Sequence, residues 1–595
     1  MTLSPSSVTA DIVILGGGLG GVAAALRLCA HDRSVVIVEP TPWLGGQATC
    51  QGVSALDEHR HIETFGGTPD YMNWRMRIRQ RMAILYGISP HDWSSFNPGN
   101  AWVSNLCFLP KIAADVIDEM LAPYVASGRC HIMRNTTWRS IHRSGNRITQ
   151  VVTQCPSGIT TIHGNLFIDA SELGDGLSLA NLTYITGAES QCDTGEAKAP
   201  AVARPEEIQG FTYCFAVSYH DGESHIIAKP EGYEQLRDQQ PFTLTLMSDA
   251  GEPRPFSVFA TGTTGLPPFW TYRRLWDGGH TNPAGEDIAM INWNSNDYHH
   301  GTIIDVADEV VSARLDEAKR LSLAFLYWMQ TEMPRDDGGF GYPGLKLMPE
   351  VMGTADGLSM TPYIREARRT PGLRRIVADD LLVEQQKNAR AICYEDSIGI
   401  GWYFMDLHPA PGNPKSMFAP TRPFQIPLGA LIPPDCTNLV MGNKNIATTH
   451  LSNGSYRLHP VEWNIGAVAG ELCDAALKHQ CNIADIWHQK AKLRAFQKRL
   501  IMQNHPIAWS IDVPFGHECF AVTQYLLANG ILEDGSIRAN QLTIELDQPL
   551  SDKEWQMLCQ ILASESLTID TTLQYATWRD VCKSLNTMLF GSGAS

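Results

Sequence analysis

The strongest pattern of hydrophobic positions lies near the start of the chain. Four apolar residues, Ile12–Leu15, predict a short buried strand, and the apolar run Val22–Leu26 behind a glycine-rich turn predicts a helix. A second apolar run, Ser34–Glu39, predicts another strand and ends in a carboxylate. Strand, turn, helix and strand in this order predict a βαβ unit, in which both strands lie parallel in one sheet.

The turn before the helix carries the spacing G-x-G-x-x-G at Gly16, Gly18 and Gly21, with Gly20 inside it. Gly16 permits a tight turn, Gly18 lets backbone approach a pyrophosphate, and Gly21 lets the helix pack closely on the strand. The helix N-terminus presents free N–H groups and the positive end of its dipole to the phosphates. Glu39 follows Gly21 by 18 residues, where a carboxylate would accept hydrogen bonds from a ribose. The motif predicts a dinucleotide site.

A second glycine pair indicates which dinucleotide binds. Gly45 and Gly46 lie in Trp43–Thr49, directly after Glu39, where backbone can lie against the ribityl chain or the ring of a flavin cofactor. A nicotinamide cofactor does not need this contact, because its ring lies further round the sheet edge.

Two later apolar strands end in residues that suit the same cofactor. The first ends at Asp169, and the second runs from Cys436 to Gly442 and Asn443. A helix predicted over Asn464–Leu477 follows, and its N-terminus would stabilise negative charge on the reduced cofactor. The residues expected to contact the cofactor are Gly16, Gly18, Gly20, Gly21, Glu39, Gly45, Gly46, Gln47, Thr49, Asp169, Gly442, Asn443 and Asn464.

Further stretches complete a family resemblance: Asn97–Ser104, Pro362–Arg369, Glu395–Gly399, Asp406–His408, Pro427–Pro433 and Arg457–Pro460. With the N-terminal motif they make the chain similar to the bacterial FAD-dependent oxidoreductase family of the glutathione-reductase structural class, over roughly residues 10–480. The resemblance implies FAD as cofactor but no particular substrate, because one scaffold of this kind hosts many reactions. Flavoproteins of this class often have Gly-Asp where this chain has Gly442-Asn443, an amide that can still donate and accept.

Pattern changes along the chain indicate its domains. We expect an α/β fold with a Rossmann-like FAD-binding domain of glutathione-reductase type at residues 1–186 and 354–480. An inserted α+β substrate domain would occupy residues 187–353, and a helical C-terminal extension residues 481–595. The expected elements are a β-meander at Trp138–Ile141, Ile148–Thr153 and Ile159–Ile162, inserted strands at Phe211–Tyr219, Phe242–Met247 and Ser257–Ala260, a helix at Ser312–Glu332, and C-terminal helices at Phe520–Leu532 and after the capping box Ser551–Glu554.

Composition narrows the location and the partners. The net charge of −17 argues against nucleic acid and anionic membranes as partners. The N-terminus lacks the features of a signal peptide, so we expect a cytoplasmic protein that acts on a small-molecule substrate. None of the 14 cysteines stands in a C-x-x-C pair, which argues against an iron–sulfur cluster as electron exit. Electrons would leave by oxygen, a small acceptor or a protein, and the oligomeric state is open.

Two histidines are the foremost candidates for a general base. His408 ends a predicted strand in which Trp402, Phe404, Asp406 and His408 share a face. His450 follows the Gly442 turn, where the chain of this class returns towards the flavin ring. Tyr403 lies beside this predicted site, and Arg365 would form an ion pair or anchor an anionic or polyol substrate. Three interpretations of Asp57–Glu63 remain: a polar loop, the lining of the substrate pocket, or a metal cluster. Flavin chemistry needs no metal, and we expect none.

The expected activity is that of a dehydrogenase or oxidase. A neutral histidine would take a proton from a hydroxyl or amine while the flavin takes a hydride from the neighbouring C–H bond. The first alternative is an NAD(P)H-dependent flavin monooxygenase, although the chain contains no second G-x-G-x-x-G. The other alternative is a non-catalytic flavin-binding redox sensor, which would not need so large an inserted domain.

Overall fold

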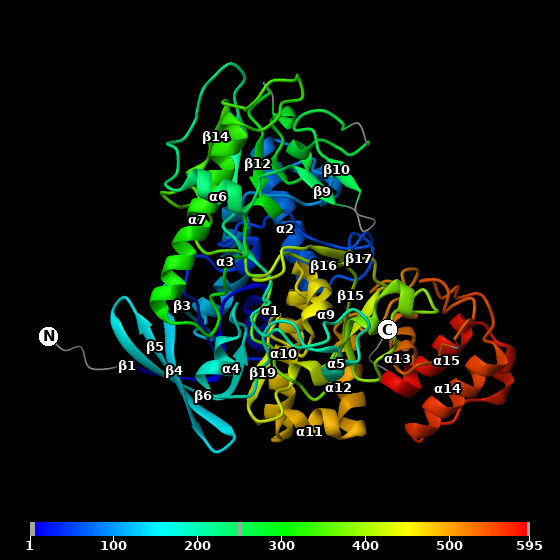
Figure 1. Ribbon diagram of the computed structural model, residues 1–595. Coiled ribbons are helices and arrows are strands. Elements are labelled where there is room, and N and C mark those ends of the chain that lie inside the picture. The colour runs from blue at the N-terminus through cyan, green and yellow to red at the C-terminus, as the bar shows by residue number, and fades with distance from the viewer. Residues whose placement is uncertain (1–5, 248–251, 263–264, 282–283, 533, 592–595) are drawn as a thin grey trace.

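The main sheet of the protein is a Rossmann-like sheet of seven strands. The computed structural model describes residues 6–247, 252–262, 265–281, 284–532 and 534–591 (Figure 1). The strand order is β3-β2-β1-β6-β5-β4, and β19 also pairs with β6. The parallel part consists of β1 (Ser6–Leu15), β2 (Val35–Val38), β3 (Cys130–Met133), β6 (Gly158–Asp169) and β19 (Leu439–Met441). This confirms the predicted α/β class.

The predicted β-meander is present as β4 (Thr137–Ser144), β5 (Arg147–Cys155) and the first half of β6, paired antiparallel. Its third strand does not stop before the parallel sheet, as the sequence suggested, but continues without interruption to Asp169. Gly164 lies at the crossing point, where a Cβ would stand 2.8 Å from a methyl group of Val13. Glycine is therefore required just after His163, where the antiparallel pairing of β6 with β5 ends and its parallel pairing with β1 continues in the same sheet.

The glycine-rich helix α1 (Leu19–Ala30) packs face to face with the long helix α10 (His459–His479). A Cβ at Gly466 would lie 1.9 Å from the carbonyl oxygen of Gly20, and a Cβ at Gly20 would lie 1.9 Å from that of Gly442. The predicted start of α10 at Asn464 is wrong, because the helix begins at His459 with a proline in its first turn. Asn464 therefore lies inside the helix, away from its N-terminus.

The inserted region forms an antiparallel sheet with a separate hydrophobic core (Figure 1, top). Its strand order is β11-β12-β8-β14, and α7 (Asp308–Thr331) packs against it. The other bounds are β8 (Phe215–Tyr219), β11 (Arg274–Trp276), β12 (Ile288–Ile291), β14 (Leu345–Leu347), α6 (Tyr233–Gln239), and the short pair β7 (Phe211–Thr212) and β13 (Asp297–Tyr298).

Two of the strands predicted for this region differ. Phe242–Met247 contains only the short β9 (Thr245–Met247), paired with β10 (Pro253–Pro255). Ser257–Ala260 is not a strand, because the backbone N–H groups of Val258, Phe259 and Ala260 donate to the carboxylate of Asp336. The Asp336 carboxylate therefore takes the place of the neighbouring strand that the apolar pattern predicted.

Helices α2 (Pro69–Tyr86) and α3 (Pro110–Ala126) follow the first βαβ unit, and the return segment contributes β15 (Ser397–Gly401), β16 (Met405–Leu407), β17 (Met417–Ala419), β18 (Phe424–Pro427) and α9 (His450–Tyr456). The C-terminal extension is helical as expected: α11 (Ile483–His488), α12 (Lys490–Met502), α13 (Phe520–Ala528), α14 (Asp552–Ser564) and α15 (Trp578–Phe590). The capping box at Ser551 is confirmed, but α13 ends four residues before the predicted Leu532. Among the described helices, none combines the length and apolar character needed to cross a membrane.

Candidate functional site

The first part of the site is the glycine turn between β1 and α1. Gly16 has a φ of 96°, and a Cβ there would lie 2.2 Å from the carbonyl oxygen of Ala170, so only glycine fits. The N-cap residue of α1 makes no side-chain cap, and in the first turn the N–H of Gly20 donates to the Glu462 carboxylate at 3.2 Å. Glu39 lies at the turn as predicted and accepts a hydrogen bond of 2.8 Å from the N–H of Gly17. The strand–turn–helix prediction is confirmed in its local geometry.

The second glycine pair packs directly on the first. The N–H of Gly45 donates to the carbonyl of Gly17 at 2.8 Å, and a Cβ at Gly46 would lie 2.9 Å from the Cα of Gly18. Gln47 follows with its amide nitrogen bonded to the Glu462 carboxylate, while its Oε1 is buried without a hydrogen-bond partner. Thr49 closes the segment through a hydrogen bond of 2.8 Å to the carbonyl of Leu44.

The residues around Gly18 fit a dinucleotide. A Cβ on Gly18 would point between the carboxylates of Glu172 and Glu462, at 2.8 and 3.0 Å from their oxygens. Glu172 Oε1 is, like Gln47 Oε1, a buried oxygen without a hydrogen-bond partner. A cofactor with ribose and ribityl hydroxyl groups would supply the donors that these two oxygens lack.

One cation near the glycine turn was not predicted from the sequence. Lys444 is 1% exposed, and its ammonium group bonds the Glu172 carboxylate. Burial lowers its pKa, but Glu172 and Glu462 outweigh burial and raise the pKa overall, so the group is charged. It directly follows Gly442-Asn443, the turn that the sequence did single out, and a lysine at that place could have been noted as a pyrophosphate partner.

Three other predicted cofactor residues occupy inner positions. Asp169 is fully buried, and its Oδ1 accepts hydrogen bonds from the N–H and hydroxyl of Ser171. Asn443 donates to the carbonyl of Ala170 at 3.2 Å. Asn464 Oδ1 accepts a hydrogen bond from His505 Nε2–H at 3.0 Å, and burial lowers the pKa of that histidine to about 4. These contacts hold the sheet edge and α10 in place.

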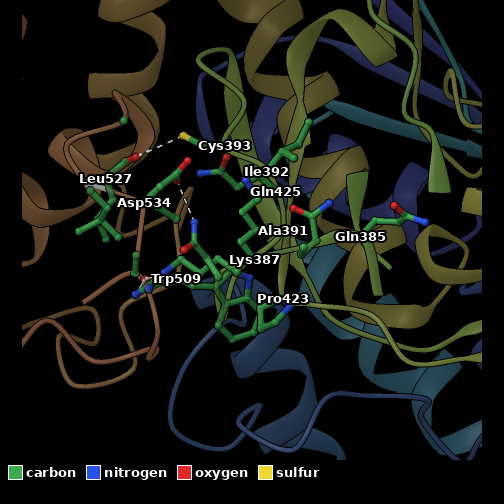
Figure 2. Close-up of a pocket in the computed structure, with 17 residues that line it drawn as sticks. Gln385, Lys387, Ala391, Ile392, Cys393, Pro423, Gln425, Trp509, Leu527 and Asp534 are labelled. Atoms are coloured by element: carbon green, nitrogen blue, oxygen red, sulfur yellow. Dashed lines mark hydrogen bonds between the residues drawn. The ribbon is translucent and has the colours of Figure 1, made fainter. Parts of the chain in front are cut away.

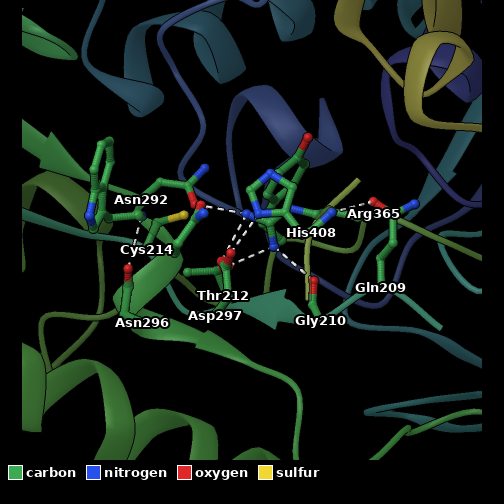
Figure 3. Close-up of polar contacts among 12 residues, drawn as sticks. Gln209, Gly210, Thr212, Cys214, Asn292, Asn296, Asp297, Arg365 and His408 are labelled. Atoms are coloured by element: carbon green, nitrogen blue, oxygen red, sulfur yellow. Dashed lines mark hydrogen bonds and ion pairs between the residues drawn. The ribbon is translucent and has the colours of Figure 1, made fainter. Parts of the chain in front are cut away.

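The second part of the site is a polar network centred on His408 (Figure 3). Its Nδ1 lies 2.5 Å from an oxygen of Asp297, which belongs to the two-residue strand β13 of the inserted region. The other oxygen of Asp297 contacts Arg365 at 3.0 Å. Burial would raise the pKa of Asp297, but Arg365 and His408 outweigh burial and hold it at about 2, so this carboxylate is ionised.

Arg365 lies within the network but faces no open space. Its guanidinium donates to the Gly210 carbonyl at 2.8 Å, to the Thr212 hydroxyl at 2.7 Å and to the Asn292 side chain at 3.1 Å. The side chain is 1% exposed.

The other ring nitrogen of His408 faces Asp406, which also pairs with Arg457. His408 Nε2 lies 3.4 Å from Asp406, whose carboxylate also contacts Arg457 at 3.1 Å. Arg457 donates to the phenolic oxygen of Tyr363 at 2.6 Å. The predicted strand through this region is much shorter than expected: β16 covers only Met405–Leu407, so Trp402 and Phe404 do not continue a ladder.

Tyr403 belongs to a neighbouring group around Asp57. The Asp57 carboxylate accepts hydrogen bonds from Arg273 at 3.0 Å and from the Tyr403 hydroxyl at 3.4 Å. Burial and the nearby carboxylates Asp57 and Asp406 raise the pKa of Tyr403 well above its ordinary value, so the phenol is protonated. The backbone N–H of Asp57 donates to Nδ1 of His459, which fixes that neutral ring with its Nε2–H on the Val53 carbonyl.

His450 is connected to His408 through two residues, Glu366 and Gln209. It is the first residue of α9, and its Nδ1 lies 2.9 Å from the Glu366 carboxylate. Burial lowers the pKa of His450, but Glu366 outweighs burial and raises it overall. Gln209 links the two histidines, because its N–H donates to Glu366 while its side-chain oxygen accepts from the N–H of His408. The structure thus brings His408 and Arg365 together at Asp297 and places Tyr403 in the neighbouring group around Asp57. His450 lies beyond Glu366 and Gln209.

The acidic segment Asp57–Glu63 divides between two roles. Asp57 faces the network described above, whereas Glu58 and Glu63 form ion pairs with Arg75 at 2.8 and 2.7 Å. His59 is buried, its pKa is lowered to about 3 by that burial, and its Nδ1 accepts a hydrogen bond from the N–H of His61. The sequence indicated Asp57 only as part of this segment, and it did not select Asp297 or Tyr363 as site residues, because their partners His408 and Arg457 lie far away in the chain.

Two cavities lie at the edges of these groups. One of about 850 Å³ is lined by residues of α7, by Tyr298 and by Ala410, Gly412 and Pro414. It therefore borders the segments that carry Asp297 and His408. The other, of about 410 Å³, lies between residues 385–393 and the C-terminal extension and is lined by Trp509, Leu527 and Asp534 (Figure 2). Its wall includes Arg390, which bonds the carbonyls of Trp509, Arg538 and Gln541.

Glu39 gives a testable pH dependence of the FAD-free protein. Burial raises the pKa of its carboxyl from 4.5 to about 7. A raised pKa means that the group's stabilising contribution is complete below pH 4.5 and is lost as the pH rises through about 7. We expect Glu39→Gln, which keeps an oxygen acceptor for Gly17, to weaken the fall in melting temperature of the FAD-free protein between about pH 5 and pH 8. An unchanged pH dependence in this variant would place the titrating group elsewhere.

Several known proteins are similar in sequence or structure to parts of this chain. Carotenoid phi-ring synthase of Chlorobaculum tepidum is 41% identical over 51 residues, which are 9% of this chain and 8% of that protein. L-proline dehydrogenase from P. horikoshii is 16% identical, with 31% of this chain and 25% of that chain covered and a TM-score of 0.17. OxyS anhydrotetracycline hydroxylase from Streptomyces rimosus is 11% identical, with 88% and 72% covered and a TM-score of 0.33.

These likenesses are partial. The matched segment spans less than a tenth of the curated relative and a quarter of the first solved structure, and TM-scores this low carry no argument about activity. The family model described as FAD dependent oxidoreductase, in contrast, matches residues 11–500, from the first strand through α12. The chain belongs to this family of FAD-dependent enzymes.

Proposed function

We propose that the protein is a dehydrogenase or oxidase that takes a hydride from a C–H bond beside a hydroxyl or amine, with His408 as general base. The observation that carries the proposal is the array Asp297–His408–Asp406, in which one imidazole lies between two carboxylates. Bound FAD would supply the two-electron acceptor for such a reaction. The residues of this chain would supply the proton transfer and the orientation.

In the proposed reaction the two nitrogens of His408 have different roles. Asp297 is ionised and would accept the Nδ1–H, which orients the ring so that proton transfer would take place at Nε2. A base held by a buried carboxylate is a common arrangement for proton abstraction. Asp406, 3.4 Å from Nε2, would stabilise the imidazolium that forms. Arg365 would act as a positioning residue, because it holds Asp297 and is itself enclosed.

The charge balance around His408 favours an uncharged substrate. Each arginine of the network has its own carboxylate: Arg273 contacts Asp57, Arg365 contacts Asp297, and Arg457 contacts Asp406. A carboxylate or phosphate on the substrate would have to displace one of these buried pairs, which is costly. The Tyr403 and Tyr363 hydroxyls add neutral hydrogen-bonding groups, which suit an alcohol or polyol.

A panel of metabolites tests this proposal. We expect one class of uncharged alcohols or amines to bleach the visible absorbance of the bound flavin anaerobically, while the matching carboxylic acids do not. Rapid bleaching by NADH or NADPH alone would favour the monooxygenase instead. Slow bleaching that does not depend on the compound would favour a redox sensor.

A further inference from the structure

Two histidines and a glutamate converge on a tight turn of the inserted region, outside the groups described so far. His220, Glu223 and His225 follow β8, and each offers one ligand atom within 4.8 Å of the other two. The two imidazole rings are 5.1 Å apart between centroids. Glu223 Oε2 lies 2.7 Å from Nε2 of His225. The spacing H-x-x-E-x-H was not selected from the sequence, which led us to expect no metal.

The backbone of this turn is fixed on both sides. The N–H of His220 donates to the carbonyl of Gly344 at 3.0 Å, and that of His225 donates to the carbonyl of Pro343 at 2.8 Å. The buried amide of Gln330 holds the outgoing chain, because it donates to the His225 carbonyl at 2.8 Å and accepts from the Ile227 N–H at 3.0 Å. The three side chains are therefore presented from a scaffold that is already in place, which lowers the cost of ordering them around a ligand.

We propose that His220, Glu223 and His225 bind a divalent transition-metal ion of the zinc type. Two imidazoles and one carboxylate are the donor set that Zn²⁺ accepts, with a further position for water. Ca²⁺ and Mg²⁺ prefer oxygen ligands throughout, so this set disfavours them. Two neighbours hold the His220 ring: Glu286 Oε1 lies 3.3 Å from its Nδ1, and the buried Ser218 hydroxyl lies 2.9 Å from its Nε2. One of these contacts would orient the ring while the other nitrogen binds the ion, and that nitrogen must exchange its present neighbour for the metal.

The degree of burial fits an exchangeable ion. The His220 side chain is 12% exposed, and those of His225 and Glu223 are 27% and 59% exposed. One side of the cluster therefore rests on the domain and the other faces solvent.

Calorimetry on the chelator-treated, dialysed holoprotein tests the site with ZnCl₂ alone. We expect one equivalent of Zn²⁺ to bind, with affinity reduced about 10- to 100-fold or more in Glu223→Gln and binding lost in the double variant His220→Ala/His225→Ala. The matched control is His142→Ala/His163→Ala, which removes two histidines from the meander strands β4 and β6 and should bind zinc as the wild type does.

Co²⁺ gives a second readout that reports on the ligands themselves. The cobalt-loaded wild type should show visible d–d absorption that is absent in the double variant, while the flavin content and melting temperature of the zinc-free proteins stay equal. The proposal is overturned if the wild type shows no saturable zinc binding. It is also overturned if the double variant binds zinc with wild-type stoichiometry and affinity, or if the meander control loses the ion.

Discussion

Replacing His408 with alanine is expected to slow reduction of the bound flavin by the true substrate about 10²–10⁴-fold, the usual loss when a positioned base is removed. Asp297→Asn is expected to give a loss in the same range, because the amide can no longer fix the ring with a charged acceptor on Nδ1–H. Both variants should keep their FAD, since neither residue lies at the glycine turn. Anaerobic stopped-flow absorbance with the substrate found by the panel measures the rate.

Two comparisons make this result specific. His142→Ala, on the exposed strand β4, should reduce at the wild-type rate. His450→Ala tests the second histidine selected from the sequence. Because Glu366 raises the pKa of His450 against the effect of burial, we expect a smaller loss there than at His408. Wild-type rates in His408→Ala and Asp297→Asn would remove this pair from the reaction, and a large loss in His450→Ala alone would transfer the role to that residue.

The second large effect concerns the cofactor itself. Gly18→Val is expected to abolish FAD binding, because the added side chain would project into the space between Glu172 and Glu462 that the cofactor must enter to reach the turn. Its backbone does not need a positive φ, so the fold should survive. The absorbance of the purified protein reports flavin content, and circular dichroism reports folding.

Two other glycines serve as controls for this variant. Gly262→Val adds the same side chain at a site where the nearest atom is 3.4 Å from the new Cβ, and it should keep full flavin occupancy. Gly20→Ala should instead lower the melting temperature, because its Cβ would lie 1.9 Å from the carbonyl oxygen of Gly442. Full flavin occupancy in a folded Gly18→Val would show that the phosphates bind elsewhere.

The parts of the fold that could be predicted from the sequence are those determined by local pattern. The first βαβ unit, the β-meander and the C-terminal helices have apolar periodicity, turn residues and caps within a few positions of one another. The errors occur where a distant group decides the outcome. Ser257–Ala260 is irregular because Asp336 takes its N–H groups. The start of α10 at His459 is a different kind of error, because Pro460 in its first turn is a local signal that the sequence did contain.

The candidate site shows the same limit. His408 and Tyr403 could be selected because they stand in a conspicuous aromatic segment, and Glu39 because its distance from the glycines is diagnostic. Asp297 could not be connected to His408, since 111 positions separate them and the contact exists only because β13 of the inserted region faces the return segment. The arginine–carboxylate pairing, on which the expected substrate charge rests, is likewise a property of the folded chain.

The central claim is that the substrate's own C–H bond supplies the hydride, and isotopic substitution tests it most directly. The measurement is the anaerobic single-turnover rate of flavin reduction with the substrate deuterated at the carbon that bears the hydroxyl or amine. The account predicts a several-fold slower reduction than with the unlabelled compound, in the absence of any nicotinamide nucleotide. Equal rates for the two isotopologues, with reduction that depends on added NADPH, would contradict it.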